Sequence, residues 1–104
     1  MPKYILAYHG GGAPESESAQ ADAMAAWGAW FGTLGNAVVD IGNPTGASTT
    51  LAADGSTSPG GGSNPLTGYS LINATDLDAA VSLSKGCPIF AGGGTIEVAE
   101  AIEM

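Results

Sequence analysis

His9 closes a short apolar stretch and is the only histidine among the 104 residues of the chain. An imidazole titrates near pH 6.5, so His9 is the one side chain suited to act as a general acid or base at neutral pH. Residues 4–10 predict a strand that ends in glycines, which places His9 at the strand's carboxyl end. The alternative is a structural histidine bonded to a loop backbone, and the sequence leaves both interpretations open.

Three further residues are predicted to line a small-molecule site beside His9. Asn43 follows the second predicted strand and Tyr69 opens the third, so an antiparallel sheet brings both to the end of the first strand. Trp27 lies in the predicted first helix, which begins at that end and would supply an aromatic wall. The expected ligand-binding residues are therefore His9, Trp27, Asn43 and Tyr69, with His9 as the catalytic candidate. Trp27 also fits a role as core packing against the sheet.

The remaining reactive side chains favour ordinary roles. Asp40 could orient His9 or simply be a solvated edge residue, and Glu97 belongs to a run of acids expected to face solvent. Cys87 precedes a proline and is expected to be a packed thiol. A metal site would need two or more His or Cys ligands, so neither a metal nor another cofactor is expected. The glycines after His9 lack the spacing of a dinucleotide fingerprint and the lysine of a P-loop.

The charge balance excludes two classes of partner. The formal net charge is −8, the only lysines are Lys3 and Lys85, and there is no arginine. Nucleic acids and anionic membranes both require a cluster of cations, which this chain lacks. A single cysteine suits a reducing compartment, and no stretch resembles a signal peptide or a membrane span. A cytoplasmic location is expected.

Hydrophobic periodicity predicts the elements in the order strand, helix, strand, strand, helix, strand. The first helix begins after an N-cap at Ser16 or Ser18 and ends at Gly35, and the second is capped by Thr75 with Asp78 and stops at Gly86. The main strands are expected at residues 4–10, 37–41, 67–73 and 95–99, with a short strand at 48–53 and a flexible loop at about 54–65. The buried helix faces are predicted to contain Met24, Trp27, Phe31 and Leu34 in the first helix and Leu77, Ala80, Val81 and Ser84 in the second. Gly28 and Gly32 are expected to allow close approach of the first helix to the sheet.

This element order predicts a single α+β domain over residues 1–104. It closes most simply as a ferredoxin-like β-α-β-β-α-β antiparallel sheet with both helices on one face. Both faces of the first strand are apolar, because Tyr4, Leu6 and Tyr8 alternate with Ile5 and Ala7. The helices cover one face, so a second copy of the chain is expected to cover the other.

Several short motifs occur in order along nearly the whole chain. These motifs are Tyr8-His-Gly-Gly11, Trp27-Gly-Ala-Trp-Phe31, Gly42-Asn-Pro44, Asn64-Pro-Leu-Thr-Gly-Tyr69, Asp76-Leu-Asp-Ala-Ala80, Lys85-Gly-Cys-Pro88 and Gly93-Gly-Thr-Ile-Glu-Val98. Together they resemble the YCII-related (DGPF) domain family. The resemblance implies a ferredoxin-like protomer that pairs sheet to sheet as a dimeric α/β barrel. It does not imply a specific reaction.

The chain departs from that family at the catalytic pair suggested for some YCII proteins. The helix position of their histidine is Ala25 here, residues 43–50 contain no acid, and the Asp-Gly-Pro-Phe motif is missing. Two functions therefore remain. The first is a homodimer that binds a small organic molecule, such as an aromatic or lactone-like compound, with or without cofactor-free acid/base chemistry at His9. The second is a non-catalytic interaction or accessory module, and whether the chain is an enzyme stays open.

Overall fold

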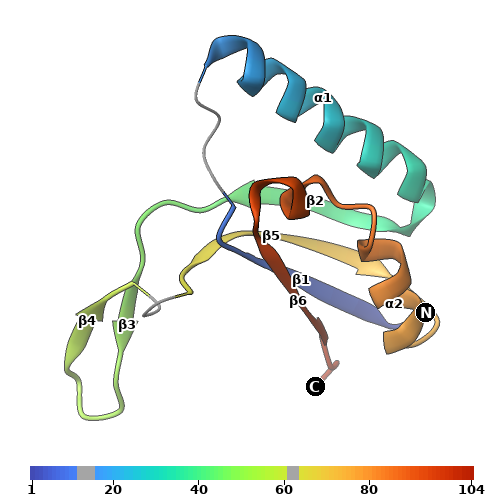
Figure 1. The fold of residues 1–104 in the computed structure, drawn as a ribbon. Helices are drawn as coiled ribbons and strands as arrows, with labels where there is room; N and C mark the ends of the chain where they lie inside the picture. The colour runs from blue at the N-terminus through green and yellow to red at the C-terminus, as the bar shows by residue number, and fades with distance from the viewer. Residues whose placement is uncertain (12–15, 61–63) are drawn as a thin grey trace.

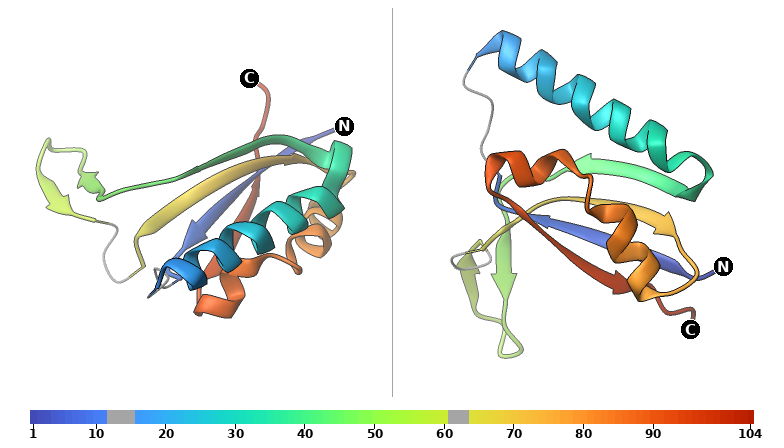
Figure 2. Two further views of the ribbon diagram at one scale, coloured as in Figure 1. Left: turned by 90° about the horizontal axis from the view of Figure 1, so that it is seen from above. Right: turned by 45° about the vertical axis from the view of Figure 1, so that its right-hand side comes forward.

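The computed structural model describes residues 1–11, 16–60 and 64–104 and shows a sheet with both helices on one side (Figures 1 and 2). The main strands are β1 (Lys3–His9), β2 (Val38–Pro44), β5 (Leu66–Asn73) and β6 (Thr95–Glu100), and the helices are α1 (Glu17–Leu34) and α2 (Leu77–Ser84). Short 3₁₀ helices, η1 (Gly35–Ala37) and η2 (Pro88–Gly92), lead into β2 and β6. The α+β class is confirmed.

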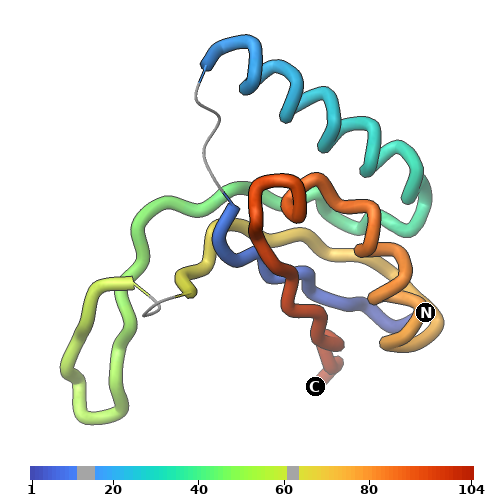
Figure 3. The backbone as a smooth tube through the Cα atoms, in the orientation of Figure 1, coloured from blue at the N-terminus to red at the C-terminus, as the bar shows by residue number. Residues whose placement is uncertain are grey.

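The four main strands form one antiparallel sheet in the order β2-β5-β1-β6. β1 pairs on one side with β5 and on the other with β6, while β2 pairs with the outer side of β5. Two short strands, β3 (Thr49–Leu51) and β4 (Thr57–Pro59), form a separate hairpin that extends past the end of the sheet (Figure 3). The arrangement is compatible with the ferredoxin-like fold.

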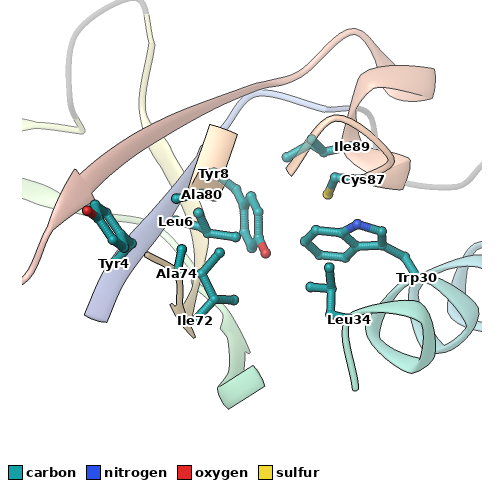
Figure 4. Packing of buried hydrophobic residues seen from close by; sticks show 10 residues of the cluster. All are labelled: Tyr4, Leu6, Tyr8, Trp30, Leu34, Ile72, Ala74, Ala80, Cys87 and Ile89. Atoms are coloured by element: carbon teal, nitrogen blue, oxygen red, sulfur yellow. The ribbon is translucent and has the colours of Figure 1, made fainter. Parts of the chain in front are cut away.

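The core lies between the helices and one face of the sheet (Figure 4). Tyr4, Leu6 and Tyr8 of β1 are buried there, while the alternate residues of the strand are half-buried. The Tyr8 hydroxyl donates to Ser70 Oγ at 2.7 Å, and Ser70 in turn donates to the Ile41 carbonyl at 2.6 Å. This buried chain of hydrogen bonds ties three strands together and leaves each of its polar groups paired.

The helix α1 contacts the rest of the molecule mainly through its C-terminal half. Trp30 and Leu34 are buried, whereas Met24 is 69% exposed, so the predicted stripe is wrong at its first position. Gly28 and Gly32 have open space where a Cβ would lie, so the expected close approach to the sheet is also wrong. The first half of the helix leans away from the sheet, which leaves Met24 in solvent (Figure 1). Gly28 and Gly32 lie in the second half, on the side of the helix that faces solvent.

The predicted caps of α1 agree with the structure, whereas the predicted N-cap of α2 is one residue away from the observed one. Ser16 is the N-cap of α1, with its Oγ accepting from Ala19 N at 3.1 Å, and Gly35 is the C-cap with a φ of 54°. The N-cap of α2 is Asp76 rather than Thr75, and its carboxylate accepts from Ala79 N at 2.7 Å. A carboxylate beside a helix N-terminus is favoured by the helix dipole, which explains why the acid wins over its neighbour.

The second predicted helix face is half wrong. Ala80 and Ser84 are buried, but Leu77 is 49% exposed and Val81 is 40% exposed. The buried side chains of α2 are small, and Leu83 packs against the core as a half-buried residue, whereas Leu77 and Val81 remain exposed. Trp30 of α1 donates its indole N–H to the Leu83 carbonyl at 3.2 Å and thereby joins the two helices.

The predicted strands differ most from the structure in β2 and β4, whereas the other strand ends differ by no more than two residues. β2 continues through Gly42 to Pro44, because irregularities in its pairing with β5 absorb the glycine instead of ending the strand. β4 lies inside the predicted flexible loop at 54–65, where Asp54 caps a tight turn by accepting from both Ser56 N and Ser56 Oγ. Residues 61–63 of that loop and the acid Glu15 lie outside the described residues.

Candidate functional site

The face of the sheet away from the helices, called here the open face, carries half-buried side chains. Strand alternation places Ile5, Ala7 and His9 of β1 on this face, because Tyr4, Leu6 and Tyr8 point into the core. Their neighbours across β5 are Leu71 and Tyr69, which are also half-buried. Within residues 1–11, 16–60 and 64–104, both helices lie on the other side of the sheet, as the views from two directions show (Figure 2).

Cross-strand register arranges four side chains of the open face into one row, called here the polar row. Asn43 of β2 pairs with Tyr69 of β5, Tyr69 pairs with Ala7 of β1, and Ala7 pairs with Glu97 of β6. Directly opposed residues point to the same face. The row therefore presents an amide, a phenol and a carboxylate, with the small side chain of Ala7 between the phenol and the carboxylate. The next row, called here the apolar row, contains Ile5, Leu71 and Ala99, with Asp40 of β2 at its end.

Asn43 and Tyr69 are in contact, as the sequence predicted. The Asn43 amide nitrogen lies 3.4 Å from the Tyr69 hydroxyl, which is a long hydrogen bond between two exposed groups. Gly42 makes this contact possible. It has a φ of 74°, and a Cβ at that position would lie 1.8 Å from the Tyr69 carbonyl oxygen. Only glycine permits this close approach of β2 to β5.

His9 lies two residues beyond Ala7 on β1, beside the polar row, and has contacts through both ring nitrogens. Its Nδ1 is 3.0 Å from the Asn64 carbonyl oxygen, which can only accept, so Nδ1 carries a proton. In the neutral ring Nε2 then holds the lone pair. The contact with a loop carbonyl is the one that the structural interpretation of His9 expects.

The second contact of His9 is with a residue that the sequence assigned to solvent. Nε2 lies 3.3 Å from Glu97 Oε1 without a directed hydrogen bond, and this contact is an ion pair only when the ring is protonated. The His9 side chain is 16% exposed, whereas the Glu97 side chain is 75% exposed. The accessible member of the pair is therefore the carboxylate. Its position follows from the antiparallel register of β1 and β6, in which Thr95 opposes His9 and Glu97 opposes Ala7.

Asp40, the other acid considered as a partner for His9, has a local role. Its carboxylate accepts a hydrogen bond from Gly42 N at 2.8 Å and stabilises the irregular part of β2. Asp40 pairs across to Leu71, so it belongs to the apolar row. Among the two acids, Glu97 is the one within reach of the imidazole.

The structure does not bring Trp27 to this site. Its ring packs edge-on against Tyr8 at a centroid distance of 5.1 Å and lies 5.8 Å from the ring of Trp30. Because Tyr8 points to the helix side of β1, Trp27 lies on the opposite side of the sheet from Tyr69. Trp27 is thus part of the aromatic packing between α1 and the sheet, which was the alternative assignment.

Cys87 and Tyr8 are buried on the helix side, and burial changes their acidity. Burial raises the pKa of the Cys87 thiol to about 11, so the thiolate is scarce at neutral pH. Burial also raises the pKa of Tyr8 to about 12, although its hydrogen bond with Ser70 acts in the opposite direction. Both groups are neutral packing elements at physiological pH.

The described residues contain no helix long and apolar enough to cross a membrane. Comparisons with protein-family models, with curated proteins and with solved structures find no match to this chain.

Proposed function

We propose that the chain is a cytoplasmic homodimer of YCII-like protomers that pair sheet to sheet and bind a small organic molecule at the polar row. The observation that carries this proposal is the grouping of His9 and Glu97 with Tyr69 and Asn43 on a sheet face that no helix covers. Ionisable and hydrogen-bonding groups beside an apolar row are the usual composition of a ligand site.

The shape of the protomer supports pairing. It is a slab of 43 × 42 × 18 Å with 6760 Å² of exposed surface. A compact monomer of its mass exposes roughly 5,300 Å². The difference exceeds the roughly 800 Å² that each partner buries in a standard interface. A face-to-face dimer would cover Ile5, Leu71 and Ala99, and it would enclose two polar rows between the sheets.

The hairpin of β3 and β4 gives a second reason to expect a partner copy. All of its strand residues are exposed, including Leu51 at 70%. An isolated two-stranded hairpin is only marginally stable in water. It extends from the end of the sheet where β1 ends, on the side away from α1 (Figure 1). In a sheet-to-sheet dimer this arm would lie beside the second copy.

The pair of His9 and Glu97 is suited to moving a proton. Nδ1 is held by the Asn64 carbonyl, which fixes the ring orientation and leaves Nε2 as the basic nitrogen. Glu97 is the exposed member, so its carboxylate would contact the ligand and relay a proton to the imidazole behind it. Tyr69 and Asn43 would position the ligand from the other end of the row, with Ala7 as the floor.

The charges of the site favour an uncharged ligand. Apart from the phenol of Tyr69, the ionisable groups of the two rows are Glu97 and Asp40, and His9 lies beside Glu97. The nearest lysine on β1 is Lys3, four residues from Ala7 and therefore roughly 13 Å along the strand. A neutral, acidic C–H or O–H compound of the phenol or lactone type fits these groups better than an anion.

Ligand-detected NMR with a panel of neutral phenols and lactones tests the proposal. We expect at least one compound to bind the wild-type protein and to shift the resonances of the single histidine. Glu97→Gln and Tyr69→Phe should each weaken binding, whereas Asp40→Asn, on the neighbouring row, should not. Equal loss in Asp40→Asn, or no binding by any compound of the panel, would contradict the assignment.

The contact between His9 and Asn64 favours a second candidate, a non-catalytic dimeric module in which His9 anchors a loop. The two candidates differ in what His9→Ala does. In the ligand-binding protein this change abolishes binding and moves the melting temperature by only a few degrees, because the residue adds little packing. In the module it lowers the melting temperature strongly, because the anchor is lost.

A further inference from the structure

An apolar groove lies on the helix side of the molecule, separate from the open face. It is formed by α2, η2 and β6 and has a volume of about 240 Å³. Its apolar lining consists of Leu77, Val81, Phe90, Ile96 and Val98. Ile96 and Val98 pack against the core on the helix side of β6, while Glu97 between them points to the open face. The groove and the polar row thus lie on opposite faces of the same edge strand.

Leu77, Val81 and Phe90 do not belong to the core cluster or to the side chains packed against it. The face of α2 that packs on the sheet is supplied by Ala80 and Ser84, which are buried. Leu77, Val81 and Phe90 are 49%, 40% and 46% exposed and gather around the groove instead of scattering over the surface. Contiguous exposed apolar side chains that line a hollow are typical of a binding site.

The groove also has a cation, which is rare in this chain. Lys85, one of only two lysines in a protein of net charge −8, lines the groove next to Ser84. Among the described residues, the Lys85 ammonium forms no ion pair with a carboxylate. The contact found there between a basic and an acidic side chain joins His9 and Glu97. In the part of the chain that the structure describes, no acidic residue lines the groove. An anion that approaches Lys85 therefore meets one positive charge and no negative one within the groove.

We propose that this groove binds a small organic anion with an apolar body, such as a medium-chain aliphatic or aromatic carboxylate. The apolar body would lie on Leu77, Val81 and Phe90, and the carboxylate would pair with the Lys85 ammonium. The volume is below the usual 300–1,000 Å³ of drug-sized pockets, so the ligand is small. The charge requirement is opposite to that of the polar row, which makes the two sites selective for different compounds.

The test uses octanoate and octanamide, which share an apolar body and differ in charge. Backbone amide shifts of the full chain are followed during titration with each compound below its aggregation limit. We expect octanoate to shift residues of α2 and η2 and to bind about fivefold more tightly than octanamide, as an exposed ion pair allows. Lys85→Gln should remove that preference, and Lys3→Gln, the matched change at the other lysine, should preserve it.

Three outcomes would overturn the proposal. The first is equal affinity of the wild-type protein for octanoate and octanamide, and the second is an equal loss of preference in the two lysine variants. The third is a protein mass that falls in Val81→Asp while that variant keeps its circular dichroism spectrum. This result would mean that a second copy of the chain occupies the groove. None of these outcomes depends on a ligand at the polar row, so the two sites are tested separately.

Discussion

The two faces of the sheet differ in what their side chains contact. On the helix side Leu6 and Ile72 are completely buried, and the hydroxyls of Tyr8 and Ser70 are paired within the core. On the open face Ile5 and Leu71 are half-buried against each other, and the ionisable pair of His9 and Glu97 lies at the row beyond them. One strand, β1, supplies both sets by simple alternation. The comparison separates residues that hold the protomer together from residues that are available for a partner and a ligand.

The largest effect on stability is expected from a substitution on the helix side of the sheet. Leu6→Ala removes a side chain with no exposed surface and should lower the free energy of unfolding by about 2–5 kcal/mol. Ile5→Ala, at the neighbouring position on the open face, should cost less. If a second copy covers Ile5 as proposed, the loss should also depend on protein concentration. Urea denaturation at two protein concentrations measures both. Equal and concentration-independent losses would mean that the two faces do not differ.

A substitution at Gly42 tests the close approach of β2 to β5 that brings Asn43 to Tyr69 in the polar row. Gly42→Ala forces a left-handed φ on alanine and a Cβ into the Tyr69 carbonyl, so it should cost about 2 kcal/mol or more. It should also separate Asn43 from Tyr69 and weaken ligand binding at the row. The matched control is Gly46→Ala, because Gly46 has open space around it. Equal melting temperatures for the two variants would contradict the close approach of β2 and β5.

Alkaline pH should lower the stability of the protein through two groups buried on the helix side of the sheet, Cys87 and Tyr8. The pKa of Cys87 rises from 9.0 to about 11 and that of Tyr8 from 10.0 to about 12 on folding. Above pH 9 the unfolded chain releases these protons while the folded chain retains them, so stability falls from about pH 9 to about pH 12. Urea midpoints over this range should decline, and Tyr8→Phe should flatten the decline above pH 10. A wild-type midpoint that stays constant to pH 11 would disprove the burial of both groups.

The smallest expected effect on stability is an increase, from substitutions of two glycines in α1. Gly28→Ala and Gly32→Ala fill open space on an exposed helix and should each stabilise the protein by about 0.5–1 kcal/mol, because alanine is the better helix former. The stripe of large side chains on α1 made close packing against the sheet the natural expectation at these positions. Thermal unfolding of the two variants decides the matter. A loss of stability would mean that another surface packs against this part of α1.

The sequence pattern predicted the elements better than the contacts of the site. Alternation along β1 and the glycine that follows α1 were enough to place the strand and the helix end, because both depend on local conformation. The contact of His9 with Glu97 depends on the register between β1 and β6, which are far apart in the sequence. The residues around Glu97 carry no local signal of that register. Trp27 was misplaced for a similar reason, since only the packing of α1 decides which side of the sheet its indole reaches. Likewise, Leu77 and Val81 repeat at helical spacing, and their exposure follows from how close the small residues bring α2 to the sheet.

The central claim is that a second copy covers the open face, and sedimentation equilibrium at micromolar concentration tests it most directly. We expect twice the protomer mass of 10.2 kDa for the wild-type chain and for Met24→Glu, which changes an exposed apolar residue on α1. Ile5→Glu should give a folded monomer, because an unpaired carboxylate cannot be buried between the sheets. A wild-type chain that sediments as a compact, well-folded monomer under these conditions would contradict the account.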